Sequence, residues 1–171
     1  MNQQELQLDI HLTLSDYLRA NYWLLFKKLK TLFFFILIAV VGYPLFVFIG
    51  VIPKNPDDNY WGMLIPLGVL LLILVGTYFG AKHQMSSHKA LNEMQKYSFT
   101  DDGIHNESSS TSGFQKWENI IEGHETSSHF LLFYSLNQLY IIPKKCFEKD
   151  YHIAEFKELL NQQLGTKFKG K

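Results

Sequence analysis

Two stretches without a charged side chain run TLFFFILIAVVGYPLFVFIGVIP from Thr31 to Pro53 and NYWGMLIPLGVLLLILVGTYFGA from Asn59 to Ala81. A helix crosses the hydrocarbon of a bilayer with about 20 apolar residues, because each residue rises about 1.5 Å and the apolar layer is about 30 Å thick. Both stretches reach that length, and only the polar segment KNPDD separates them. The sequence therefore predicts an antiparallel transmembrane hairpin over residues 31–81.

The alternative is a pair of buried core helices in a soluble protein. The rest of the chain holds only about 120 residues, too few to surround two helices that are apolar on every side. The mean hydropathy of −0.05 is ordinary only because it averages two very apolar segments with a polar remainder. The sequence thus favours the membrane hairpin.

Basic side chains flank the two apolar stretches on the side of the chain termini, whereas the short connection carries one lysine and two aspartates. Basic residues beside a membrane span stay in the cytoplasm. The sequence therefore predicts a multi-pass protein with both termini cytoplasmic. These side chains can also contact anionic lipid headgroups, although a plain topology signal accounts for them as well. The candidate headgroup contacts are Lys27, Lys28, Lys30, Lys82 and Lys89.

The polar remainder is acidic. The chain has 16 basic and 16 acidic residues, but from Asn92 to Leu164 eleven acidic side chains face six basic ones. This charge argues against nucleic-acid binding, which requires neutralisation of phosphates. The single cysteine, Cys146, excludes an intrachain disulfide and agrees with a reducing compartment.

Apolar and polar side chains alternate from Leu6 to Leu14, the period of a half-buried strand. A single strand is not stable alone, so this strand needs a sheet to join. The only other long polar sequence follows Ala81, which predicts a split domain whose first strand precedes the hairpin. Ser15 and Asp16 then predict a helix start, so residues 1–30 are expected to be a strand and an amphipathic juxtamembrane helix.

Strand patterns recur after a helical connector predicted at residues 82–96. The Asp101-Asp102-Gly103 turn favours a hairpin because glycine accepts a positive φ, and the polar loop 108–113 predicts a second one. Further strands are predicted at 130–134 and 139–142.

From Asp150 the period changes to that of an amphipathic helix, which Gly165 ends. Strands followed by one helix predict an α+β domain over residues 97–165: a bent antiparallel sheet closed by a C-terminal helix. A basic tail, 166–171, follows.

The segment YSFTDDGI (97–104), the serine-rich loop leading to Trp117 and the segment YIIPKKCF (140–147) resemble the YcxB-like family of small bacterial membrane proteins. The resemblance covers Tyr97 to Leu160, together with the hairpin and the N-terminal strand. It implies a location in the bacterial inner membrane and a C-terminal domain similar to pleckstrin-homology-like (PH-like) modules. It transfers no catalytic motif, so no site residue comes from it.

No catalytic, cofactor or metal site is predicted. The seven histidines form no His-x-x-x-His spacing, and one cysteine cannot form Cys-x-x-Cys. Asp101 and Asp102 are more typical of a turn than of an acid–base pair, and His124 and His129 are expected at exposed polar positions. Lys144 and Lys145 are expected to be solvated, with a phosphate contact as the alternative. Cys146 is expected to be a small core residue rather than a nucleophile, since no base is evident.

The two apolar stretches contain no Asp, Glu, Lys, Arg or His, which argues against an ion or proton pathway. Gly76 and Gly80 match the small-residue motif for close helix contact. We expect them to pack against the first span, although the sequence leaves packing between chains, and hence a homo-oligomer, open.

We therefore expect a non-enzymatic inner-membrane protein that presents a PH-like domain to a protein partner or to anionic membrane lipids. Two alternatives remain open. One is a regulator or immunity-type partner of another membrane protein, and the other is a membrane-bound enzyme, which would need a concave site with converging titratable groups.

Overall fold

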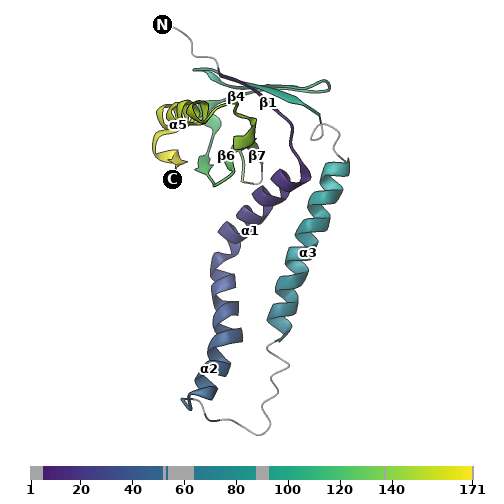
Figure 1. Cartoon of the computed structure of the whole chain (residues 1–171), viewed down its shortest axis with the longest axis vertical. Helices are drawn as coiled ribbons and strands as arrows, with labels where there is room; N and C mark the ends of the chain where they lie inside the picture. The colour runs from purple at the N-terminus through teal and green to yellow at the C-terminus, as the bar shows by residue number, and fades with distance from the viewer. Residues whose placement is uncertain (1–5, 52, 54–63, 88–92, 137, 171) are drawn as a thin grey trace. The chain divides into compact units, whose positions relative to one another are not determined.

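The structure is a computed structural model that describes residues 6–51, 53, 64–87, 93–136 and 138–170, with only the backbone described at 39, 43 and 64. The chain divides into two compact units (Figure 1). The first joins Met1–Ala20 to Gln84–Lys171, and the second is Asn21–His83. The Lys54–Asp58 connection predicted between the spans and the candidate headgroup contact Lys89 lie outside the described residues.

Long apolar helices form most of the second unit. Helix α1 (Leu14–Leu37) continues through a π-helical turn, η1 (Ile38–Gly42), into α2 (Tyr43–Phe48), and α3 spans Leu64–Ser87. Residues 14–48 and 65–87 are each long and apolar enough to cross a membrane, and almost none of either apolar segment is buried within the chain. A core helix of a soluble protein would be mostly buried, so the soluble alternative is disfavoured.

The two prolines in these helices have different effects. Pro44 follows the π-helical turn because its ring cannot donate to, and clashes with, the carbonyl four residues earlier, which disturbs the α-helical ladder there. Pro66 lies in the first turn of α3, where a missing amide is tolerated.

The glycines of α3 do not pack as expected. A Cβ built on Gly76 or Gly80 meets no described atom within 4 Å. The expectation that these glycines pack against the first span is therefore wrong for this chain. One contact between α1 and α3 within this unit is polar, because the Tyr22 hydroxyl donates to the Leu74 carbonyl at 3.1 Å.

The first unit contains a four-stranded antiparallel sheet in the order β1-β2-β3-β4. Strand β1 (Leu6–Ile10) pairs with β2 (Gln95–Phe99), with Leu8 opposite Tyr97. The prediction that the N-terminal strand joins the later sheet is confirmed. The other strands are β3 (Gly103–Glu107) and β4 (Ser112–Lys116).

A second four-stranded sheet has the order β7-β6-β5-β8. Its strands are β5 (Glu122–Glu125), β6 (His129–Phe133), β7 (Leu139–Pro143) and β8 (Phe168–Lys169). The α+β class is confirmed, but two sheets replace the single bent sheet that the sequence predicted. A 3-10 turn, η3 (Trp117–Asn119), interrupts the chain between β4 and β5 and directs Trp117 and Ile120 inward, because both are buried.

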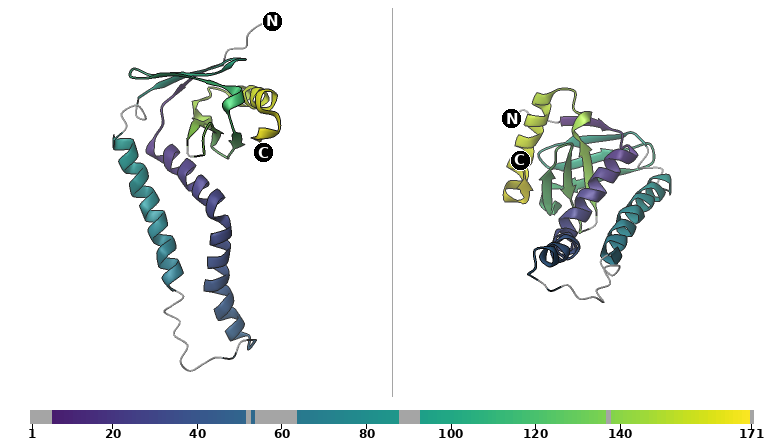
Figure 2. Two further views of the ribbon diagram at one scale, coloured as in Figure 1. Left: turned by 180° about the vertical axis from the view of Figure 1, so that it is seen from behind. Right: turned by 60° about the horizontal axis from the view of Figure 1, so that its bottom comes forward.

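Aromatic side chains of the two sheets contact each other, as Tyr97 of β2 and Tyr140 of β7 do. Helix α5 (Asp150–Leu164) lies beside the sheets (Figure 2). Phe156 of α5 is fully buried, with its ring 4.7 Å from that of Phe99 in β2 and 5.1 Å from that of Phe130 in β6. The predicted C-terminal amphipathic helix is confirmed, as is its end at Gly165, which has φ +53°.

Position 103 requires glycine for a reason other than the predicted positive φ. Its φ is not positive, but a Cβ there would lie 2.4 Å from the Gln115 carbonyl oxygen. Thr100 donates its amide to the Gly103 carbonyl at 3.0 Å and closes the β2–β3 turn. Glycine is therefore required by the close approach of β4.

Two predicted boundaries differ in the structure. α3 continues to Ser87, but β2 already begins at Gln95, inside the helical connector expected at 82–96. The basic tail is not uniform, because Phe168 and Lys169 form β8 and pair in parallel with β5.

The split first unit can be tested by two truncated chains. Replacing residues 21–83 by a Gly/Ser linker of about eight residues should leave the fold of the first unit intact, since β1 and the ends of α1 and α3 belong to that unit. Residues 84–171 alone should lose cooperative unfolding, since β2 loses its β1 partner and the core loses Leu8 and Ile10. Amide exchange would measure both, and equal protection of β2 in the two chains would contradict the prediction.

Candidate functional site

The N-terminus of α1 is held by a reciprocal cap between Thr13 and Asp16. The Thr13 amide donates to Asp16 Oδ2 at 3.0 Å, and the Asp16 amide donates to Thr13 Oγ1 at 3.3 Å. This is the capping-box arrangement, with aspartate in place of the more common glutamate. The helix therefore starts one residue before the predicted Ser15, and the cap fixes the Asp16 carboxylate in place.

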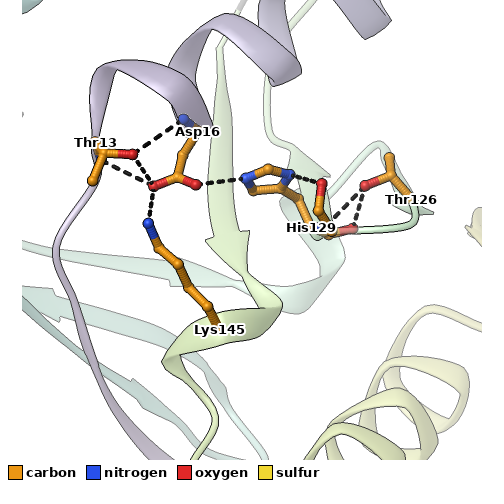
Figure 3. A network of polar contacts seen from close by, with 6 residues as sticks. Thr13, Asp16, Thr126, His129 and Lys145 are labelled. Atoms are coloured by element: carbon orange, nitrogen blue, oxygen red, sulfur yellow. Dashed lines mark hydrogen bonds and ion pairs between the residues drawn. The ribbon is translucent and has the colours of Figure 1, made fainter.

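The same carboxylate contacts two distant segments of the first unit (Figure 3). Asp16 Oδ1 lies 3.3 Å from Nε2 of His129 in β6, and Oδ2 accepts from Lys145 Nζ at 2.5 Å. His129 Nδ1 lies 2.8 Å from the Ser128 hydroxyl. The Thr126 hydroxyl accepts from the His129 amide at 2.9 Å and completes the network.

The electrostatics favour a charged aspartate and a neutral histidine. Burial opposes ionisation of Asp16, but hydrogen bonds from Lys145 and Thr13 outweigh it and hold the pKa of the carboxyl well below its usual range. Burial also lowers the pKa of His129, against the opposing effect of Asp16. The imidazole thus donates through Nε2 to Asp16 and accepts the Ser128 hydroxyl at Nδ1.

A serine, a histidine and an aspartate in one hydrogen-bonded chain are the groups that activate a nucleophile in hydrolases. Here the imidazole is only 2 % exposed and the carboxylate 4 %. Two cavities of about 620 and 480 Å³ in this unit are lined by other residues. With both groups buried, the network fits a role in holding the first turn of α1 to the second sheet.

The larger cavity lies along β1, β2 and β3 and includes Cys146. Burial raises the pKa of the Cys146 thiol, which disfavours the nucleophilic thiolate. Among the residues that the structure describes, no group of three or more His, Cys, Asp or Glu side chains could hold a metal ion. The cavity therefore offers neither an activated thiol nor such a cluster.

The predicted headgroup contacts are placed as follows. Lys27, Lys28 and Lys30 are exposed on α1, and Lys82 is exposed on α3. The Lys27 ammonium lies 5.4 Å from the ring centroid of Trp23, a cation–π contact next to an aromatic residue suited to the membrane interface.

Other predicted residues occupy different surroundings from those expected. His124 and His129 are buried, not exposed, because β5 and β6 lie in the interior of the second sheet. Lys144 and Lys145 are not merely solvated, since Lys144 pairs with Glu125 at 2.7 Å and Lys145 with Asp16.

Sequence reasoning identified Asp16 as part of a helix start but missed its role in the network. The Thr-x-x-Asp spacing was the available signal for the cap. His129 lies 113 positions from Asp16, and no local pattern pairs them.

Asp16→Asn should lower the free energy of unfolding by about 2 kcal/mol at pH 7, because the neutral amide loses the charge-assisted bond from the half-exposed Lys145 and accepts less strongly from the buried His129. Asp9→Asn, an exposed change on β1, is the matched control. Urea unfolding in detergent, followed by Trp117 fluorescence with Trp23 and Trp61 replaced by Phe, would measure both. Equal losses would contradict the role of the network.

The network also predicts that the free energy of unfolding falls in two steps as the pH is lowered. The pKa of folded His129 lies below its usual 6.5, so stability should fall as the pH drops below about 6.5, where only the unfolded imidazole gains a proton. The depressed pKa of Asp16 adds stability above about pH 4 that is lost at lower pH. His129→Gln should remove the first step, and Asp16→Asn should remove the second. Unchanged curves would exclude the network as their source.

The comparisons with known proteins concern the region from β2 to α5. The family model of the YcxB-like protein matches residues 99–160. A search of curated proteins and a search of solved structures each found no match. The family match confirms the resemblance drawn from residues 97–104 and 140–147, and residues 99–160 of this chain are similar to the YcxB-like family.

Proposed function

We propose that the chain is a non-enzymatic protein of the bacterial inner membrane, anchored by two spanning helices, with both termini and the first unit in the cytoplasm. Its two sheets and α5 form a PH-like domain that binds a protein partner or anionic lipid. The observation that carries the proposal is the pairing of β1 with β2. Because two long apolar helices lie between these strands in the chain, an even number of crossings returns β2 to the side of β1.

The charges support this orientation. Lys27, Lys28 and Lys30 precede the charge-free part of α1, and Lys82 lies near the end of α3. Positively charged residues beside spans favour the cytoplasmic side and attract anionic lipid by about 1 kcal/mol each. Within the domain, by contrast, Lys144 and Lys145 are engaged by carboxylates. The proposal therefore assigns the lipid contact to the helix ends and leaves the domain for a protein partner.

The topology can be tested by single cysteines in a Cys146→Ser chain. Gln7→Cys on β1 and Ser109→Cys in the β3–β4 loop are both exposed positions. We expect a membrane-impermeant maleimide to label both in inverted membrane vesicles and neither in right-side-out vesicles. Labelling of the two positions from opposite sides would overturn the two-span proposal.

The lipid contact can be tested by replacing Lys27, Lys28 and Lys30 together by Gln. We expect the amount of phosphatidylglycerol that co-purifies in mild detergent to fall at least threefold, because three attractions to anionic headgroups are lost. A matched chain with Lys96, Lys116 and Lys149 replaced by Gln removes the same charge from the domain and should retain the lipid. Equal retention in the two variants would leave these lysines as a topology signal alone.

A further inference from the structure

We infer that the edge of β5 is a docking site for a basic–aromatic–basic peptide segment, and that Lys167, Phe168 and Lys169 occupy this site within the chain. The inference rests on the proposed binding function and specifies the chemistry of its protein partner.

Strand β8 has little main-chain pairing with β5. It pairs through two positions only, Phe168 opposite Gly123 and Lys169 opposite His124. From Gly165 to Gly170, Phe168 is the single buried residue. A segment with so little pairing and one apolar anchor opens more readily than the central strands of the same sheet.

The Phe168 ring occupies the space over Gly123 of β5, which is called the seat below. Gly123 has no side chain, and a Cβ built there would lie 3.0 Å from both the Phe168 ring and Leu164 Cδ1. The Phe168 ring therefore lies directly over the backbone of β5, with the ring of Phe130 at 6.4 Å between centroids. A larger residue at position 123 would fill the seat.

Hydrogen-bond acceptors for lysine ammonium groups lie on both sides of this seat. The Lys167 ammonium donates to the Ile120 carbonyl at 3.0 Å and to the Glu118 carbonyl at 3.3 Å. The Lys169 ammonium donates to Glu122 Oε1 at 2.5 Å. The site thus holds a cation from Lys167, which ends a 3-10 turn (Gly165–Lys167), and then an aromatic ring and a second cation from the two residues of β8.

Main-chain pairing combined with side-chain seats is how a sheet edge recognises a peptide strand. The partner's chemistry is that of the occupant, Lys-Phe-Lys. Cytoplasmic segments beside membrane spans are rich in basic and aromatic residues, and this domain is proposed to lie at the same membrane face. The partner segment is therefore the cytoplasmic juxtamembrane segment of another membrane protein.

The test uses the full chain in detergent and a fluorescein-labelled peptide, Thr-Lys-Phe-Lys-Gly, followed by fluorescence anisotropy. Phe168→Ala empties the seat and should bind the peptide at least tenfold more tightly than the wild type. Lys169→Glu keeps the ring but places a second carboxylate at Glu122, and it should bind about threefold more tightly. Lys149→Glu, which reverses an exposed charge before α5, should match the wild type.

Two further measurements give the specificity. A peptide with Ala in place of Phe should bind none of these chains, and adding Gly123→Ala to Phe168→Ala should weaken binding because the new Cβ enters the seat. Circular dichroism identifies variants that remain folded. If Phe168→Ala unfolds, peptide binding to the Lys169→Glu chain tests the inference.

Folded variants that bind the peptide no more tightly than the wild type, or that bind both peptides equally, would overturn the inference. Membrane topology does not enter this measurement. Failure here therefore leaves the cysteine labelling result, and the membrane proposal with it, unchanged.

Discussion

The fold of this chain depends on the pairing of β1 with β2, two strands joined by the long helical segment between Ile10 and Gln95. A five-residue strand is not stable alone, and β1 gains its stability from the ladder with β2 and from the burial of Leu8 and Ile10. The pairing brings both flanks of the helical segment into one unit. The helices are thereby an insertion within a domain rather than an N-terminal attachment to it.

Asp16 connects this pairing to the second sheet. Its carboxylate caps α1 through Thr13, accepts from Lys145 and lies beside the buried His129 imidazole. Each contact offsets part of the cost of burying a charge, and together they keep the carboxylate ionised. A buried charge with several specific partners favours one position of the first turn of α1 on the sheet, because any other position would leave a buried polar group unsatisfied.

The distribution of charge and of sheet edges favours binding over chemistry. Titratable side chains inside the first unit are used in pairs, such as Lys144 with Glu125 and Lys169 with Glu122. The Ser128–His129–Asp16 chain has the groups of a hydrolase, but its imidazole and its carboxylate are both buried. The recognition features that we propose are the seat over Gly123 for a peptide and the lysines of α1 for a lipid surface.

The sequence by itself determined the elements whose signal is local: the two long apolar helices, the alternating β1, the hairpin turn before Gly103 and the amphipathic α5. Only the tertiary structure decided which polar residues are buried and how the strands divide into two sheets. The β5 segment, Glu-Gly-His-Glu, has no apolar alternation and becomes a central strand through its neighbours β6 and β8. His129 is buried because Asp16, 113 positions away, supplies its partner. The spacing of apolar residues indicates which face of a helix or strand is buried. Burial of a polar side chain depends instead on a hydrogen-bonding partner, which can lie far away in the sequence.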